Sequence, residues 1–168
     1  SLMAFAFNCK EASKKAPRGT SWKECKKSTR KGSDIKEFLL TKDGDLFAYI
    51  PKTNQDICQI TSNVVDFKAS AHPNDAATAY YVSNGDLSYV RTERAVQGGN
   101  CPKANKALLM KNVKKIDGKY QYSVVSNTNT TIVNVALDTS NVVRAWANTG
   151  APVYTDTNVV DYSMNQCY

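Results

Sequence analysis

The stretch Asn63-Val64-Val65-Asp66-Phe67 decides the fold, because it recurs 95 positions later as Asn158-Val159-Val160-Asp161-Tyr162. A weaker copy, Asn112-Val113-Lys114-Lys115-Ile116, lies between the two, 49 positions after the first and 46 before the last. Self-similarity at this spacing is typical of β-propeller blades and of other β repeats. The sequence therefore predicts about three related units, each built from three or four strands.

Short apolar runs rich in Val, Ile, Tyr and Phe fill these units. They alternate or cluster without the i, i+3, i+4 spacing of an amphipathic helix, so they predict strands. The runs span residues 35–40, 46–50, 64–68, 78–83, 87–91, 107–113, 120–125, 131–137, 142–146 and 159–164. Asp43-Gly44, Asn84-Gly85 and Asp117-Gly118 each predict a tight hairpin, because the central residues of a type I′ turn need positive φ.

The two ends of the repeat body complement each other. The body begins with a hairpin at 35–50 that no Asn-Val-Val strand precedes, and it ends with such a strand at 158–161 that no hairpin follows. Pairing the two would leave no exposed sheet edge. We therefore predict an all-β fold of about three β-meander repeats in a closed, propeller-like or β-trefoil-like arrangement. A homodimer that pools six units is the alternative if three cannot close alone.

Positive charge is concentrated at one end of the 168-residue chain, whose net charge is +7. Residues 1–34 hold nine bases and three acids, whereas residues 35–168 hold 13 bases and 12 acids. We predict a basic, Cys-containing N-terminal arm over 1–34 and a single all-β repeat domain over 35–168. Such an arm attracts acidic surfaces, although a merely solvated arm explains the same counts. The candidate binding residues are Lys14, Lys15, Arg18, Trp22, Lys26, Lys27 and Arg30.

The five cysteines favour disulfides over a metal site. They stand at positions 9, 25, 58, 101 and 167 without a C-x-x-C pair, and the chain has a single histidine. We predict a disulfide between Cys9 and Cys25, because it would close a small loop in a segment with few apolar anchors. Pairing of either one to Cys167, or five free thiols in a reducing compartment, are the rival interpretations. Disulfides favour a secreted or periplasmic location.

The sequence predicts no catalytic residue, cofactor or metal ligand. His72 lies near Ser70 and Asp75, but closeness in sequence does not make a catalytic triad. Asp66 and Asp161 occupy equivalent strand positions, which favours a solvent-facing acid or a hydrogen-bonding strut over a glycosidase pair. The longest charge-free apolar run, residues 2–7, is far shorter than the about 20 residues of a membrane helix, so no transmembrane segment is predicted.

The function we predict is an exported, non-catalytic binding or adhesion module that recognises a glycan, a cell-surface polymer or a protein, with the basic arm attracting acidic surfaces. Aromatic side chains offer flat contact faces, but we expect most of them in the core. These are Tyr80, Tyr81, Tyr89, Tyr120, Tyr122, Trp146 and Tyr154. Nucleic acid is a less favoured partner because Trp22 is the one large aromatic side chain among the clustered bases. The alternative is a secreted hydrolase acting on a polyanion or a cell-wall polymer.

Overall fold

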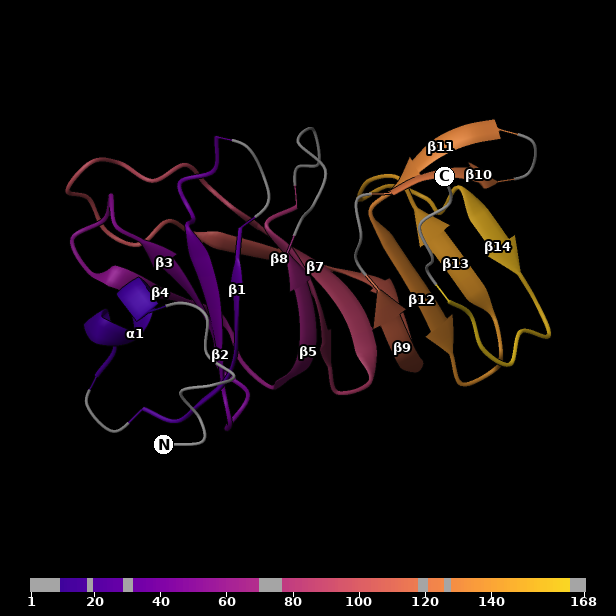
Figure 1. The fold of residues 1–168 in the computed structure, drawn as a ribbon, viewed down its shortest axis with the longest axis horizontal. Coiled ribbons are helices and arrows are strands. Elements are labelled where there is room, and N and C mark those ends of the chain that lie inside the picture. Colours follow the sequence, from indigo (N-terminus) through magenta and orange to yellow (C-terminus); the bar gives the residue numbers. More distant parts are fainter. Residues whose placement is uncertain are drawn as a thin grey trace.

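Three four-stranded antiparallel sheets follow one another along the chain in the computed structural model (Figure 1). The model describes residues 10–17, 20–28, 32–69, 77–117, 121–125 and 128–163. The first sheet contains β1 (Trp22–Lys27), β2 (Glu37–Thr41), β3 (Leu46–Ile50) and β4 (Asp56–Thr61), in that spatial order. The second contains β5 (Val64–Ala69), β6 (Ala79–Ser83), β7 (Asp86–Thr92) and β8 (Ala104–Met110).

The third sheet repeats this plan with an insertion. Its spatial order is β9 (Val113–Asp117), β12 (Asn134–Asp138), β13 (Val143–Trp146) and β14 (Tyr154–Asp156). Between β9 and β12 the chain forms a separate hairpin of β10 (Gln121–Val125) and β11 (Thr128–Ile132). The one helix in the described residues, α1 (Lys10–Lys15), precedes the sheets. The prediction of an all-β body with about three meander repeats is confirmed.

Left-handed asparagines precede the second sheet, the third sheet and the segment that follows the third sheet. Asn63, Asn112 and Asn158 have φ values of 57°, 55° and 59°, a region that asparagine tolerates better than most residues. The next residue in each case donates its backbone N–H to a carbonyl in the turn of the preceding sheet. The three pairs are Val64 to Gly44 at 2.9 Å, Val113 to Gly85 at 2.6 Å and Val159 to Asn141 at 2.8 Å. The sequence repeat is therefore also a repeat of backbone geometry.

The core lies between the sheets. Apolar side chains of the first and second sheets, including Phe38, Leu40 and Phe67, form one buried cluster. A second cluster, with Tyr80 and Trp146, joins the second and third sheets. The second sheet thus uses one face for each neighbour, which explains why four consecutive residues of β6 are buried.

The outer faces of the end sheets are also covered. α1 lies on the outer face of the first sheet, where Ala12 packs with Cys25 and Leu39. The backbone N–H of Ala12 donates to the buried carboxylate of Glu37 at 3.3 Å. On the third sheet, Val159 and a half-buried Tyr162 pack against the apolar outer face.

Lysines protect the free edges of the first strands. Lys23 and Lys26 of β1 donate to the carbonyl oxygens of Val65 and Phe67 on β5, at 3.1 and 3.0 Å. Lys26 also lies 4.9 Å from the centroid of the Phe67 ring. These side chains occupy the carbonyls that another chain's strand would use, and they join neighbouring sheets without a shared strand.

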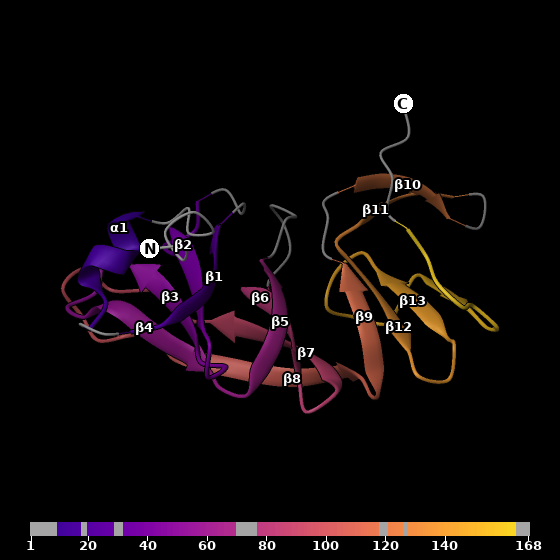
Figure 2. The ribbon, with the colours of Figure 1, turned by 60° about the horizontal axis from the view of Figure 1, so that its bottom comes forward.

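The predicted closure of the fold is wrong. Residues 159–163 lie against the third sheet and do not pair with β2 and β3. Both views place the first and third sheets at opposite ends of an open row, with the second sheet between them (Figures 1 and 2). The physical reason is that β1 and β4 already pair with the two edges of the β2–β3 hairpin, so no edge is left for a closing strand. β1, moreover, belongs to the first sheet although it lies within the segment 1–34 that we expected to be an arm.

Candidate functional site

Tight turns and sheet-to-sheet crossings gather along one edge of the array, which we call the turn rim. It contains the β2–β3, β6–β7 and β12–β13 turns and the crossings after β4, β8 and β14, along the lower side of Figure 1. The longer loops, including the β7–β8 loop at 93–103, lie at the opposite end of the strands, which we call the loop end. One edge of the array therefore carries tight turns and crossings, and the opposite edge carries the longer loops.

A pocket of about 360 Å³ lies on the turn rim between the first and second sheets. Its lining combines the β2–β3 and β6–β7 turns with the start of β5, in the residues Lys23, Thr41, Lys42, Asp43, Gly44, Asn63, Val64, Val65, Asn84 and Gly85. Asn63 and Asn84 have φ values of 57° and 52°. Gly44 has a φ of 92°, and a Cβ there would lie 3.1 Å from the Val64 carbonyl oxygen, so the close approach of the two sheets needs glycine.

Several polar groups of this pocket make no contact within the described part of the chain. The ammonium of Lys42 and the side-chain amides of Asn63 and Asn84 are exposed and unpaired there. The ammonium of Lys23, by contrast, is held by the Val65 carbonyl. The pocket thus offers one free cation and two free amides beside one exposed carboxylate, Asp43.

Acids elsewhere on the turn rim bind the backbone of the rim itself. Asp138 accepts hydrogen bonds from the N–H groups of Ser140 and Val142, both at 2.9 Å, and Asp86 accepts one from Asn112 at 3.2 Å. Lys111, in contrast, is exposed, and its ammonium forms no hydrogen bond or ion pair with described residues. These acids therefore stabilise the turns and crossings, whereas the ammonium groups of Lys42 and Lys111 are available to a ligand.

The pocket lysines are not repeated in every sheet. The second residue of the first strand is Lys23 in the first sheet, Val65 in the second and Lys114 in the third. Lys114 donates to the side-chain oxygen of Asn141 at 2.9 Å. The polar residue that recurs at each crossing is asparagine, and its left-handed backbone explains the recurrence without a ligand.

The structure spreads the candidate binding residues of the basic segment over separate places. Lys14 is exposed on α1, and Lys15 lies 3.9 Å from Asp56. The Trp22 ring packs edge-on against Phe47, with centroids 6.0 Å apart. These three residues belong to α1 and β1, and none of them lines the pocket on the turn rim.

The remaining candidates on β1 divide in the same way. Lys26 forms an ion pair with Glu24 at 3.0 Å in addition to its contacts with Phe67, so it has a structural role. Lys27 is exposed, and its ammonium forms no hydrogen bond or ion pair with described residues. Arg18 and Arg30 lie outside the described residues.

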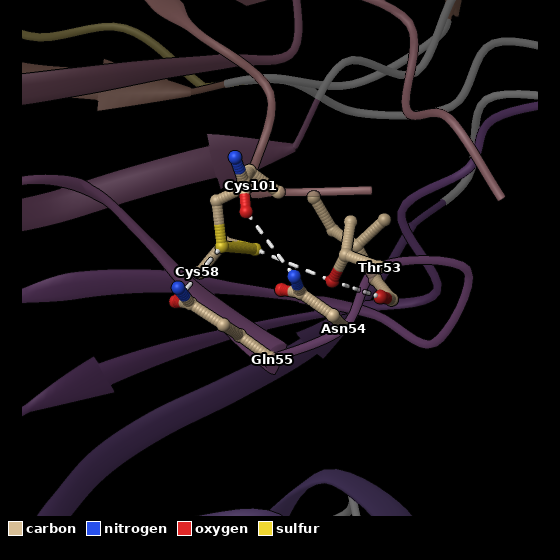
Figure 3. Close-up of a disulfide and its surroundings, with 7 residues drawn as sticks. Thr53, Asn54, Gln55, Cys58 and Cys101 are labelled. Carbon is tan, nitrogen blue, oxygen red and sulfur yellow. Dashed lines mark hydrogen bonds between the residues drawn. A yellow bond between two sulfur atoms is a disulfide. The ribbon is translucent and has the colours of Figure 1, made fainter. Parts of the chain in front are cut away.

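One disulfide joins the first two sheets. Cys58 on β4 is bonded to Cys101 in the β7–β8 loop, with a Cα–Cα distance of 5.6 Å (Figure 3). Around it, the Asn54 N–H donates to the Gly99 carbonyl at 2.8 Å, and its side chain donates to Asn100 at 3.1 Å. Sequence analysis did not identify this pair, because spacing does not determine connectivity.

The other expected disulfide stays a prediction. Cys25 is disulfide-bonded, but Cys9 lies outside the described residues. Among the residues that the structure describes, no group of three or more His, Cys, Asp or Glu side chains could hold a metal ion.

Neither of the two equivalent acids is buried: Asp66 is half-buried and Asp161 faces solvent, and both accept hydrogen bonds. Asp66 accepts the N–H of Phe67 at 2.8 Å, and Asp161 accepts the N–H of Tyr162. Asp161 also binds the Lys115 ammonium at 2.8 Å, and this hydrogen bond is the largest cause that lowers the pKa of its carboxyl. Burial raises the pKa of the Tyr162 hydroxyl above its ordinary value. His72 lies outside the described residues.

Most of the described aromatic faces are core, as expected. Tyr80, Tyr81 and Trp146 are buried. Tyr89 is half-buried, with the Arg91 guanidinium 5.1 Å from its ring centroid. The half-buried Tyr154 donates its hydroxyl to Asp156 at 3.2 Å. Tyr120 and the side chain of Tyr122 lie outside the described part.

Comparison with known proteins assigns no relative. Within the described ranges, α1 is too short to cross a membrane, and no other helix is present that could do so. The sequence matches no protein-family model, and searches of curated proteins and of solved structures found no similar chain.

Proposed function

We propose that the protein is a non-catalytic binding module whose turn rim binds an acidic polymer, such as an anionic glycan of a cell surface. The observation that supports this most directly is the pocket between the first two sheets. There the Lys42 ammonium and the Asn63 and Asn84 amides are unpaired within the described residues, and a carboxylate- or sulfate-bearing ligand would use those donors.

A polymer suits this rim better than a small ligand. A single exposed ammonium group such as that of Lys42 contributes little to the affinity for a ligand. Further rim cations, Lys111 and Lys114, lie at the next crossing along the array. A ligand with repeated negative charges would engage several of these weak sites at once, which raises the overall affinity without any strong single contact.

Disulfides support export of this module. The Cys58–Cys101 bond and the disulfide-bonded Cys25 are typical of an oxidising compartment, so we propose a secreted or periplasmic location. The exposed Lys14 and Lys27 of the basic segment would add nonspecific attraction to the same acidic surface. The three-sheet array serves here as an open, propeller-like scaffold that holds the rim rigid.

The hydrolase alternative has less support. Its carboxylate candidates Asp66 and Asp161 each accept a backbone N–H, and Asp161 also binds Lys115. A carboxylate that makes these hydrogen bonds stabilises the backbone beside it, which is a structural role and not a catalytic one.

The test compares two double variants of equal charge. Lys42→Ala/Lys111→Ala removes two unpaired cations of the turn rim, and Lys36→Ala/Lys103→Ala removes two exposed lysines near the loop end. Calorimetric titration with heparin and with hyaluronan measures affinity at low and high salt. At about 0.5 kcal/mol per exposed charge, the rim variant should bind about fivefold more weakly and lose part of the salt dependence, while the control stays within twofold. Equal losses in both variants would contradict a site on the rim.

A further inference from the structure

The β6–β7 turn contains the one Asn-Gly dipeptide of the 168-residue chain, Asn84-Gly85. In such a pair the backbone nitrogen of the glycine can attack the side-chain amide carbon of the asparagine, because glycine has no Cβ to obstruct the approach. Whether this reaction occurs in a folded protein depends on the hydrogen bonding of that nitrogen and on the space around it.

The backbone nitrogen of Gly85 is free within the part of the chain that the structure describes. Both residues of the turn are exposed, and φ is 52° at Asn84 and 79° at Gly85. The pairing of Ser83 with Asp86 closes the turn and leaves the Gly85 N–H without a hydrogen bond. A Cβ built at Gly85 would meet no atom within 4 Å, so the space around this residue is open.

The four other left-handed asparagines that the structure describes are protected from this reaction. Each is followed by a valine whose backbone N–H donates a hydrogen bond at 2.6 to 2.9 Å, and the branched side chain crowds the nitrogen further. These valines are Val64, Val113, Val142 and Val159. Their nitrogens must give up a hydrogen bond before they can attack, whereas the nitrogen of Gly85 need not.

The matching turn of the first sheet provides a comparison within the same pocket. Asp43-Gly44 can form the same five-membered ring, with loss of water in place of ammonia. There, however, the Gly44 N–H donates to the Thr41 carbonyl at 3.1 Å, and a Cβ at Gly44 would lie 3.1 Å from the Val64 carbonyl oxygen. The nitrogen of Gly44 is therefore held by a hydrogen bond, and its residue packs against the next sheet.

We propose that Asn84 is a site of spontaneous modification, at which the protein loses ammonia and gains a negative charge in its pocket. The Gly85 nitrogen gives up its proton and bonds to the Asn84 Cγ, the bond from Cγ to the amide nitrogen breaks, and ammonia leaves. Water then adds to either carbonyl of the resulting succinimide and opens the ring. The product has aspartate or isoaspartate at position 84, and the reaction needs no oxidant or reductant.

The modification alters both the charge and the backbone of the turn rim. The Asn84 side chain lines the pocket with Asp43, so a second carboxylate there opposes the attraction of Lys42 for an acidic ligand. Isoaspartate also lengthens the backbone of the turn, whose Gly85 carbonyl accepts the Val113 N–H at the crossing to the third sheet. We therefore expect modified protein to bind an acidic polymer more weakly. This consequence rests on the proposed function, whereas the modification does not.

The first experiment measures the reaction itself. The full chain is incubated in mildly alkaline buffer, and peptide mapping by mass spectrometry follows ammonia loss at Asn84 and isoaspartate formation at Asp43. Each rate is compared with that of a synthetic peptide containing the same turn. We expect Asn84 in the folded chain to react within about tenfold of its peptide, and Asp43 to be slowed about tenfold further by the hydrogen bond of Gly44. An unreactive Asn84 in the folded chain, or equal slowing at the two turns, would overturn the proposal.

The second experiment separates the modification from the proposed function. Asn84→Asp carries the charge of the product from the start, and Asn105→Asp adds the same charge at an exposed position of β8 near the loop end. Calorimetric titration with heparin should show about twofold weaker binding for Asn84→Asp and no change for Asn105→Asp. If Asn84 loses ammonia but Asn84→Asp binds heparin like the parent, binding in this pocket is wrong and the modification site stands.

Discussion

Removing the Cys58–Cys101 disulfide should destabilise the protein more than any single hydrogen-bond deletion. The bond joins residues 43 positions apart and connects β4 of the first sheet to the β7–β8 loop of the second (Figure 3). The double variant Cys58→Ala/Cys101→Ala removes the cross-link without leaving a new thiol. Thr53 keeps its hydrogen bond to the Ile50 carbonyl at 2.8 Å, so the nearby turn retains its own support.

The size of the effect follows from the closed loop. In the chain-entropy account, a cross-link over 43 residues lowers the free energy of the native state relative to the unfolded state by about 4 kcal/mol. Loss of the buried Cys58 sulfur adds a small packing cost. For a domain of this size, about 4 kcal/mol corresponds to a fall in Tm of about 8 to 16 °C.

Urea unfolding followed by circular dichroism, together with calorimetry, measures both quantities. Thr53→Val is the matched control, because it removes the hydroxyl contacts with the Ile50 carbonyl and the Cys58 sulfur and leaves the cross-link intact. It should cost about 1 kcal/mol. A double variant that unfolds within about 0.5 kcal/mol of the parent would refute the reasoning, since the loop would then be held by its backbone hydrogen bonds alone.

The other predictions concern the repeat contacts. Asn63→Ala should lower the free energy of unfolding by about 1 kcal/mol, because alanine is strained at positive φ, whereas Asn63→Gly should change it by less than about 0.5 kcal/mol in the same urea assay. Lys26→Met should lower Tm by a few degrees through loss of its contacts with β5, whereas Lys27→Met, at an exposed position without contacts, should leave Tm unchanged. The folded pKa of Asp161 is lowered by Lys115, so their contact is present above the unfolded pKa and is lost as the pH falls through the folded value. Hydrogen exchange at residues 159–163, corrected for intrinsic rates, should therefore accelerate below about pH 4 and stay constant between about pH 5 and 7.

The repeat could be predicted from sequence because few residue types fit its turns and crossings. Few residue types tolerate the left-handed backbone conformation at the crossings, so asparagine recurs at positions 63, 112 and 158. The Asn84-Gly85 turn likewise has positive φ at both residues, as the dipeptide predicted. Where backbone geometry limits the choice of residue, a pattern survives that can be found without a structure.

Strands at sheet edges were harder to predict for the opposite reason. β1 has the sequence Trp-Lys-Glu-Cys-Lys-Lys and was included in the basic arm, because four of its six residues are charged. An edge strand needs few apolar residues, and lysine is a common means of protecting it. β4 was missed as well, since its apolar residues are interrupted by Gln59 and its sheet position is also an edge.

The candidate site could not be identified from the sequence, because lysines in similar stretches of sequence have different neighbours in the structure. Lys26 was predicted to bind a ligand, yet it holds the Phe67 carbonyl and pairs with Glu24. Lys42 attracted no notice in the sequence, yet its ammonium is unpaired beside the asparagines of the pocket. What separates a structural lysine from an available one is whether a strand edge with free carbonyls lies within reach of its ammonium. Whether such carbonyls are within reach depends on which first strands are neighbours. The arrangement of the sheets in an open row determines this, and local composition does not.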